Sequence, residues 1–169
     1  IGGWIGRTMG PRLGATKKAL NNIEMAFPDK SHEEHKTIVR DMWDNLGRVV
    51  TEYPHINYLV KNRVSFDGIQ TIRQYWQDGE AAVFISAHLG NWELVAPYTA
   101  YKITDKVNTV YRAPNNPFVE NLLLRARNSD KTRTIPKSRT GALRMVNALK
   151  NGEIVGILFD QKYFWAINR

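Results

Sequence analysis

The chain has 169 residues, of which 43% are hydrophobic and 11% aromatic, and it contains no cysteine. This length and composition fit a folded domain with a core, and they exclude a globally disordered chain, a disulfide framework and sites built on cysteine. The longest apolar run, residues 81–87, is far shorter than the roughly twenty residues that a membrane-spanning helix requires. Because the chain opens on Ile1 rather than Met, we expect it to start inside a longer protein.

The net charge of +8 comes from one part of the sequence. Residues 101–150 carry eleven Lys and Arg against three acidic residues, whereas basic and acidic residues balance elsewhere. This asymmetry favours an anionic partner. A solvated basic face without a dedicated ligand is the alternative.

The N-terminal part of the chain is predicted to be helical. Residues 1–13 combine apolar residues at helical intervals with glycines and basic residues, which suits a membrane interface; a surface segment packed on the domain is the alternative. Residues 16–27 and 31–53 are expected to form helices, the second opened by a capping box of Ser31 and Glu34.

Side chains along residues 31–53 indicate which face of that helix is buried. The predicted apolar stripe consists of Ile38, Met42, Leu46, Val49 and Tyr53. The histidines at the ends of this unit are interpreted as surface or capping residues: His32, His35 and His55. No metal site is predicted, because these residues do not recur at the spacing of metal ligands.

From residue 64 onward, strands and helices are predicted to alternate. Apolar runs and alternating residues indicate strands at 64–66, 81–87, 107–112, 133–137 and 153–159. Helical patterns follow from residue 69, at 92–103 with a bend at Pro97, from Asn116–Pro117, and at 140–150. The inward-facing side chains of the last two helices are expected to be Phe118, Leu122 and Leu123, and Leu143, Val146 and Leu149.

This alternation predicts an α/β fold with a largely parallel central sheet, flanking helices and an N-terminal helical segment. We expect residues 1–62 to form the helical, candidate membrane-interface segment and residues 63–169 to form the α/β core, together making one folding unit. Sites in such sheets lie at the carboxyl ends of the strands. His88, Arg112, and the pair Asp160 and Gln161 each follow a predicted strand.

His88 and Glu93 stand five residues apart where a strand gives way to a helix. The turn brings the two side chains towards each other, so that His88 can accept a proton while Glu93 fixes its tautomer. In the alternative interpretation Asn91 caps the helix, Glu93 complements the helix dipole, and His88 is an ordinary strand-end residue. Spacing and context alone leave both interpretations open.

Several other chemistries lack their sequence motifs. The chain has no Gly-x-Ser-x-Gly nucleophile elbow, no Walker-type phosphate loop and no Gly-x-Gly-x-x-Gly after a strand. A histidine base without a protein nucleophile would activate a substrate hydroxyl or water directly.

Six segments in order resemble one known family: NIEMAFPDKS, MWDNLGRVVTEYPHI, FISAHLGNWEL, VYRAPNNPFVENLLLRAR, PKSRTGALRMVNAL and GILFDQK. They are similar to the bacterial lipid A biosynthesis acyltransferases, the lauroyl and myristoyl transferases of the glycerolipid acyltransferase superfamily. The resemblance covers residues 20–162 and implies transfer of a fatty acyl chain from acyl carrier protein to a hydroxyl of a lipid A precursor, at the cytoplasmic face of the bacterial inner membrane. The family motif of His, four residues, then Asp or Glu matches His88 and Glu93.

By this resemblance His88 takes the proton of the acceptor hydroxyl and Glu93 orients the imidazole, without a covalent enzyme intermediate. Asp160 and Gln161 match an Asp-Gln pair of the family and are predicted to hold polar substrate groups or the loop around the dyad. An acceptor carrying phosphates would explain the basic region 101–150, and the predicted contacts are Arg112, Lys137 and Arg139. Asn91 is predicted as a helix cap in preference to a substrate contact. The expected partners are acyl carrier protein, an anionic lipid acceptor and the membrane surface. No cofactor, metal or nucleic acid is expected.

The sequence departs from the family at both ends. The hydrophobic anchor expected before Ile1 is missing, and the tail after Lys162 does not resemble the usual continuation, so we expect a truncated fold and an inactive fragment. Two alternative functions stay open: a sister acyltransferase acting on another glycolipid or a glycerophospholipid, and a non-catalytic fragment that binds anionic lipid or nucleic acid. The basic region lacks clustered aromatic residues, which counts against single-stranded nucleic acid.

Overall fold

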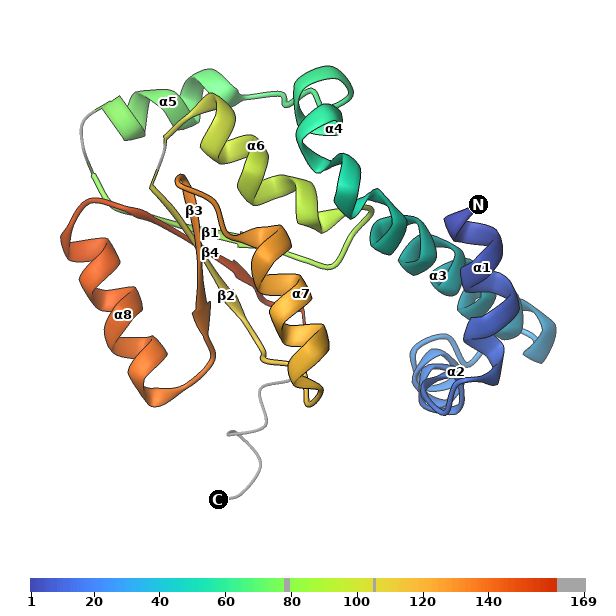
Figure 1. Cartoon of the computed structure of the whole chain (residues 1–169). Helices are drawn as coiled ribbons and strands as arrows, with labels where there is room; N and C mark the ends of the chain where they lie inside the picture. The colour runs from blue at the N-terminus through green and yellow to red at the C-terminus, as the bar shows by residue number, and fades with distance from the viewer. Residues whose placement is uncertain (78–79, 105, 161–169) are drawn as a thin grey trace. The chain divides into compact units, whose positions relative to one another are not determined.

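The structure, a computed structural model, describes residues 1–77, 80–104 and 106–160 of the chain (Figure 1). These residues group into two compact units, Ile1–Pro54 and a second unit that begins at His55. The first unit is helical, and the second holds a four-stranded sheet with helices around it. The predicted α/β class with a parallel sheet and an N-terminal helical segment is confirmed. None of the described helices combines the length and the hydrophobicity needed to span a bilayer.

The first unit consists of α1 (Gly2–Met9), η1 (Gly10–Arg12), α2 (Ala15–Ala26) and α3 (His32–Glu52). The predicted capping box opens α3: the Ser31 hydroxyl accepts from the Glu34 backbone N–H, and the Glu34 carboxylate accepts from the Ser31 N–H. These bonds also hold the pKa of Glu34 at about 2, below its ordinary value, chiefly through the Ser31 backbone N–H. The short connection between α2 and α3 therefore ends at Ser31, where the capping box begins α3.

Glycines allow α1 to pack directly on the backbone of α3. A Cβ atom at Gly6 would collide with the backbone carbonyl oxygen of Trp43, and one at Gly10 would collide with the Trp43 ring. Gly47 of α3 also permits this close packing, because a Cβ atom there would collide with the Gly2 carbonyl oxygen. The glycines among residues 1–13 therefore make this close contact between the two helices possible.

The buried face of α3 differs from the predicted stripe. The buried residues are His35, Val39, Trp43 and Val49, whereas Met42 is exposed. The face is set by the contact with α1, which lies against Trp43 and Gly47. His35 is correspondingly buried, and its ring bonds the carbonyl oxygen of Phe27, the C-cap of α2, so of the two predicted roles, surface or capping, the second fits.

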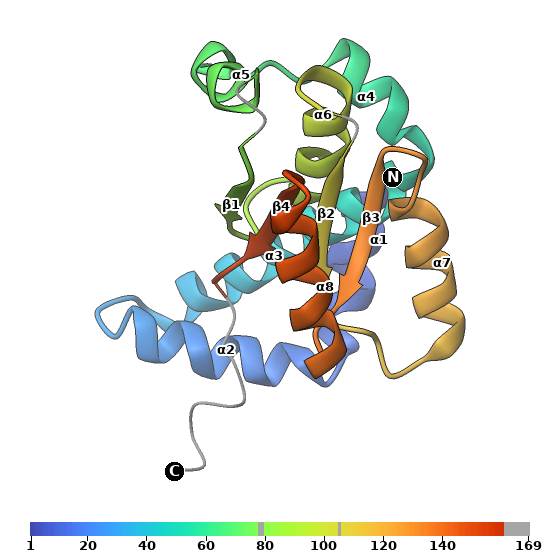
Figure 2. The same ribbon diagram turned by 90° about the vertical axis from the view of Figure 1, so that its left-hand side faces the viewer.

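The second unit begins with η2 (Tyr53–His55) at its border and α4 (Ile56–Asn62), followed by α5 (Ile69–Gln77). The strands are β1 (Ala82–Ser86), β2 (Val107–Tyr111), β3 (Thr132–Pro136) and β4 (Ile154–Leu158). Between them lie η3 (Trp92–Leu94), α6 (Val95–Lys102), α7 (Pro117–Arg127) and α8 (Arg139–Lys150). The sheet is entirely parallel, and its order is β1-β4-β2-β3, so β4, the last strand among the described residues, lies between β1 and β2 (Figure 2).

Helices cover the two faces of the sheet unequally. α8 lies against one face, and α6 and α7 lie on the other (Figure 1). The core forms between α6 and the sheet, where Ala100 packs with Val107 and Ile154, and Phe84 packs against them. Ile154 and Val155 of the inner strand β4 are only 1% exposed. This sheet order and core place the carboxyl ends of β1 and β4 side by side.

Several local predictions for the second unit were wrong. Residues 64–66 are not a strand, and the 92–103 helix divides into η3 and α6, with Pro97 in the first turn of α6, where proline is tolerated without a bend. The predicted inward-facing residues of α7 and α8 include four exposed ones: Phe118, Leu122, Leu143 and Val146. In α8 the buried positions are Gly141 and Ala148, because small residues let the helix lie close to β3.

Candidate active site

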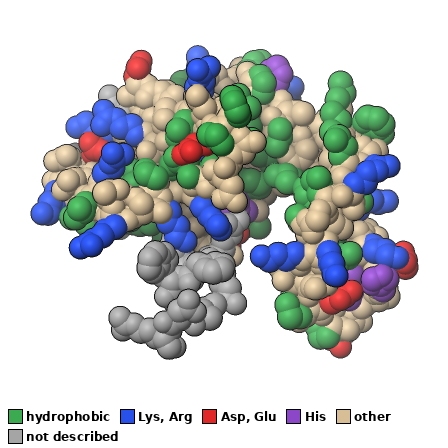
Figure 3. All heavy atoms as spheres, turned by 60° about the horizontal axis from the view of Figure 1, so that its bottom comes forward, with side chains coloured by type: hydrophobic (Ala, Val, Ile, Leu, Met, Phe, Trp, Pro, Cys, Tyr) green, Lys and Arg blue, Asp and Glu red, His purple; other side chains and the backbone are tan. Residues whose placement is uncertain are grey.

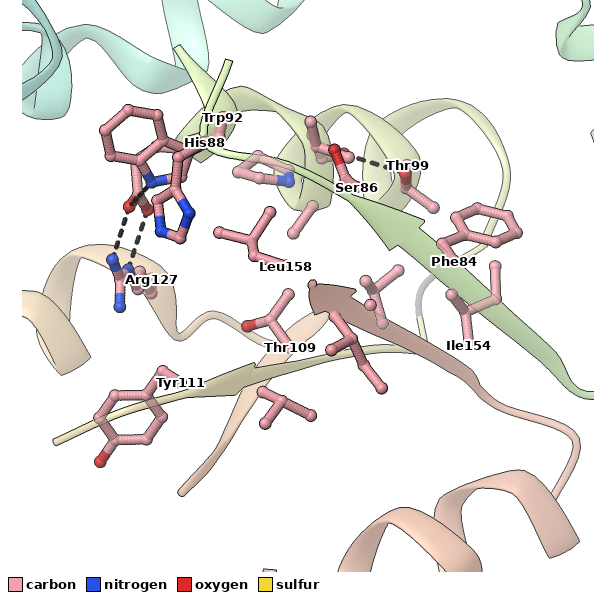
Figure 4. A pocket seen from close by; sticks show the side chains of 18 of the residues that line it. Phe84, Ser86, His88, Trp92, Thr99, Thr109, Tyr111, Arg127, Ile154 and Leu158 are labelled. Carbon is pink, nitrogen blue, oxygen red and sulfur yellow. Dashed lines mark hydrogen bonds and ion pairs between the residues drawn. The ribbon is translucent and has the colours of Figure 1, made fainter. Parts of the chain in front are cut away.

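A cavity of about 280 Å³ lies at the carboxyl ends of the strands, between the sheet and α6 (Figure 4). Its apolar part is lined by Phe84, Ile154 and Leu158, and its polar part by His88, Glu93 and Arg127 among others. Figure 4 shows His88, Trp92 and Arg127 gathered at one end, away from Phe84 and Ile154. A cavity with an apolar part and a few polar groups at one end is typical of a site for a small or amphipathic ligand.

Strand register brings His88 and Asp160 together. β1 and β4 are parallel neighbours in which Ser86 pairs with Leu158, and Phe159 donates its backbone N–H to the Ser86 carbonyl at 2.9 Å. His88 follows β1 by two residues and Asp160 follows β4 by two residues, so the two side chains emerge at the same level. The predicted meeting of strand ends at one edge is therefore seen directly for these two residues.

Asp160 holds His88 through two hydrogen bonds. The His88 backbone N–H donates to Oδ2 at 2.9 Å, and Nδ1 of the ring lies 2.8 Å from Oδ1. The backbone N–H, followed by the ring, lowers the pKa of Asp160 below its ordinary value, so the carboxyl group is ionised and can only accept. Nδ1 must then carry the hydrogen, which leaves the lone pair on Nε2. This is the tautomer of a histidine that accepts a proton at Nε2.

Glu93 is engaged elsewhere. The guanidinium of Arg127 in α7 donates to it from Nε at 2.9 Å and from Nη2 at 2.5 Å, and the Trp92 indole N–H donates to Oε1 at 2.8 Å. The Glu93 side chain is only 8% exposed, and the three bonds satisfy the buried carboxylate. In the part of the chain that the structure describes, the carboxylate on Nδ1 of His88 is thus that of Asp160, and the predicted His88–Glu93 contact is not the one formed.

Trp92 contacts both the hydrogen-bonded His88–Asp160 pair and the Glu93–Arg127 ion pair. Its ring packs edge-on against the His88 imidazole, with centroids 4.9 Å apart and planes at 66°, while its N–H binds Glu93. Asn91 caps η3 by accepting the Glu93 backbone N–H at 3.1 Å, the capping role that the sequence favoured. Between His88 and Asn91, Gly90 adopts φ 54°, a conformation that favours glycine. The turn therefore holds His88, Trp92 and Glu93 in one cluster.

The predicted binding residues separate into two groups. Arg112 and Lys137 line the cavity together with His88. Arg139 is exposed at the first position of α8 and is not among the residues lining the cavity. Gln161 lies outside the described residues. On the face of the second unit drawn in Figure 3, Lys and Arg side chains are spread widely, with few acidic ones among them.

Comparison of the sequence with known proteins adds to this geometry. The profile of one family, described as bacterial lipid A biosynthesis acyltransferase, matches residues 1–166. The chain belongs to this family. The resemblance predicted from six ordered segments is thereby confirmed, and the match extends over both compact units.

Two members of the family with assigned names are similar to the chain. One is the lipid A biosynthesis palmitoleoyltransferase of Escherichia coli (strain K12), and the other is the lipid A biosynthesis acyltransferase of Shigella flexneri. Each is 24% identical over 168 residues, which cover 92% of this chain and 54% of the relative. The chain thus spans about half the length of the curated relatives that it matches.

Sequence reasoning did not single out Arg127 or Trp92, and it assigned Asp160 to the substrate or the loop. Arg127 was one of eleven basic residues in 101–150, and nothing in its spacing distinguishes it from the others. The usable signal for Asp160 was its position after the last strand, but its pairing with His88 depends on β4 lying beside β1, which strand spacing does not reveal.

Proposed function

We propose that the protein containing this chain transfers a fatty acyl group from acyl carrier protein to a hydroxyl of a lipid A precursor, with His88 as the general base. The observation that carries the proposal is the hydrogen bond between Asp160 and His88, which puts the hydrogen on Nδ1 and the basic lone pair on Nε2 in a residue that lines a partly apolar cavity. Membership of the acyltransferase family supplies the reaction class. The apolar lining fits an acyl chain, and the polar end fits the reacting groups.

In the proposed reaction, Nε2 of His88 removes the proton from the acceptor hydroxyl as its oxygen attacks the thioester carbonyl carbon. The C=O electron pair moves onto oxygen, and a tetrahedral intermediate forms. Re-formation of the carbonyl breaks the C–S bond, and the departing thiolate takes the proton from His88. The products are an ester and a thiol, and His88 returns to its starting state.

The other residues of the site have separate proposed roles. Asp160, rather than Glu93, is the positioning residue that fixes the tautomer of His88. Glu93 holds Arg127 on the cavity wall, where a positive charge stabilises the negative charge that develops on the carbonyl oxygen. Arg112 and Lys137, also on the wall, are proposed to bind an anionic group of the acceptor.

The same protein is proposed to act at the cytoplasmic face of the bacterial inner membrane. Exposed apolar side chains on α1 and after η1 support contact with a membrane surface: Trp4, Ile5, Met9 and Leu13. The nearby Arg12, Lys17 and Lys18 are exposed and suit an anionic lipid surface.

The test is an acyl-transfer assay with the purified full-length protein that contains this chain, acyl–acyl carrier protein and lipid A precursor, with the ester product measured by mass spectrometry. His88→Ala is expected to reduce the transfer rate by about 10²–10⁴-fold, since it removes the base, while His55→Ala leaves the rate unchanged. Undiminished transfer in His88→Ala would contradict the proposed base. Transfer only to a glycerophospholipid or another glycolipid would support the sister acyltransferase instead.

A second comparison separates the roles of Asp160 and Glu93. Asp160→Asn places an amide beside Nδ1, and its N–H donation favours the tautomer with hydrogen on Nε2, which cannot accept a proton. Nitrogen-15 NMR of the His88 ring is expected to report this change in Asp160→Asn and no change in Glu93→Gln. If Glu93→Gln changes the tautomer and Asp160→Asn does not, Glu93 is the partner of His88, as the sequence predicted.

A further inference from the structure

Three side chains of types that bind metal ions lie close together in the first unit. Glu24 of α2 and His32 and His35 of α3 each bring one ligand atom to within 4.8 Å of the other two. It is the one such group of three among residues 1–77, 80–104 and 106–160. None of the three residues has a part in the proposed acyl transfer.

The spacing of these atoms is close to that of a metal site. Nδ1 of His32 lies 3.3 Å from Oε1 of Glu24. Two ligands at about 2.0–2.1 Å from a tetrahedral Zn²⁺ are themselves about 3.3–3.4 Å apart. The wider separation within the group is closed by side-chain rotation, for which the exposed Glu24 and His32 have room.

His35 is prepared for ligation by its backbone partner. Its ring is buried, and Nε2 lies 2.9 Å from the carbonyl oxygen of Phe27, which can only accept. Nε2 therefore carries the hydrogen, and the lone pair is on Nδ1. A ring N–H donated to a backbone carbonyl is the usual second contact of a metal-binding histidine, because it orients the ring.

The charges around the cluster permit a cation. His32 lies in the first turn of α3, where the helix dipole disfavours positive charge, but Glu33 and Glu34 occupy the same turn. The neighbouring cations are paired, Lys36 with Glu33 at 2.8 Å and Lys30 with Glu34 at 3.3 Å. Together with Glu24, the local charge is negative before a metal binds.

We propose that Glu24, His32 and His35 bind one Zn²⁺ ion that fastens the end of α2 to the start of α3. Two imidazoles and a carboxylate form a ligand set that Zn²⁺ takes, and solvent completes the coordination at this partly exposed position. Because α2 has no buried residue, polar contacts hold it to the rest of the unit, and a metal would add to the His35–Phe27 bond at its end. Hydrogen bonds hold its start, where the Thr16 hydroxyl donates to the Gly10 carbonyl oxygen at 2.7 Å and accepts from the Trp43 indole at 2.9 Å.

The binding test is calorimetric titration of the full chain, prepared without a polyhistidine tag and freed of metal with a chelator, with ZnCl₂. One Zn²⁺ per chain is expected, with binding at least about tenfold weaker in Glu24→Gln and in His32→Ala, since loss of even an outer-shell partner weakens a zinc site roughly 10–100-fold. Asp41→Asn, an exposed acid further along α3, and His55→Ala are the matched controls and are expected to bind Zn²⁺ as the wild type does. MgCl₂, whose ion prefers oxygen ligands, is expected to give no binding.

Amide hydrogen exchange tests the fastening separately. Zn²⁺ is expected to slow exchange in residues 20–35 of the wild type and not in Glu24→Gln. Both substituted side chains are exposed, so the variants are expected to fold, and circular dichroism checks this. No binding to the wild type, equal binding in Glu24→Gln and His32→Ala, equal losses in the controls, or binding without slower exchange would each overturn the proposal.

Discussion

A single carboxylate decides how His88 is held. Asp160 is 72 positions further along the chain, and it binds both the backbone N–H and the ring of His88. Glu93 is only five positions away, yet it binds Arg127. Proximity in sequence was therefore a poor guide to the partner of the histidine, because strand register, not the local turn, sets which side chains meet.

The Asp160 contact predicts a pH-dependent stability. In the unfolded chain this group titrates near its ordinary pKa of 3.8, and in the folded protein its pKa is lower, chiefly because the His88 backbone N–H donates to the carboxylate. The ionised carboxylate therefore stabilises the fold fully at a pH above the pKa that Asp160 has in the unfolded chain. This stabilisation is lost as the pH falls through the lower pKa of the folded protein. Thermal unfolding is expected to show wild type more stable than Asp160→Asn at neutral pH, with the difference shrinking below pH 3.8.

The Asp130→Asn variant is the control for this measurement, since Asp130 is an exposed acid in the loop between α7 and β3. A stability difference between wild type and Asp160→Asn that stays constant down to the lowest accessible pH would contradict the contribution assigned to the ionised carboxylate.

Among the helices and strands, the packing of α1 on α3 depends on glycines, which have no side chain to keep the two backbones apart. Gly6, Gly10 and Gly47 lie where a methyl group would meet backbone or an aromatic ring. Backbone cannot move aside as a flexible side chain can, so this contact tolerates little enlargement.

Gly6→Ala is expected to destabilise the first unit by about 1–3 kcal/mol, because its Cβ would collide with the Trp43 carbonyl oxygen. Gly14→Ala, at the start of α2, is the matched control, since a Cβ there meets nothing within 4 Å. Urea unfolding followed by circular dichroism measures both. A loss in Gly14→Ala as large as that in Gly6→Ala would show that the helix contact is not the cause.

The sequence predicted the elements better than their buried faces. Strands and helices follow from local residue patterns, and the four strands of the sheet lie within a residue or two of their predicted positions. The faces of α3, α7 and α8 were not predicted correctly. α3 buries Val39 and Trp43 rather than Met42, and α7 has no buried residue. α8 buries Gly141 and Ala148, which hydrophobic periodicity does not weight. The three-residue run 64–66 was too short for its pattern to distinguish a strand from a loop.

For the whole molecule, charge and exposed apolar residues suggest the same kind of partner. The net charge is +8, and the exposed Trp4, Met9 and Leu13 of the first unit lie near basic residues in the sequence. An anionic bilayer surface satisfies both features, because lipid headgroups attract the charge and the interface takes up the apolar side chains.

Co-sedimentation with vesicles tests this expectation. Binding to phosphatidylglycerol vesicles is expected to exceed binding to phosphatidylcholine vesicles and to fall with added salt. Trp4→Ser is expected to weaken it by about tenfold, whereas Tyr58→Ser, a comparably exposed aromatic of α4, leaves it unchanged. Preferential, salt-sensitive binding to an oligonucleotide instead of vesicles would favour the nucleic-acid alternative.

The position of β4 between β1 and β2 has a consequence for the order in which the nascent chain acquires its site. β1 and β2 share no ladder of their own, so the sheet stays divided until residues 154–158 have left the ribosome and inserted between them. His88 receives Asp160 in the same event. The contact between Asp160 and His88 therefore reports that β4 has taken its place between β1 and β2.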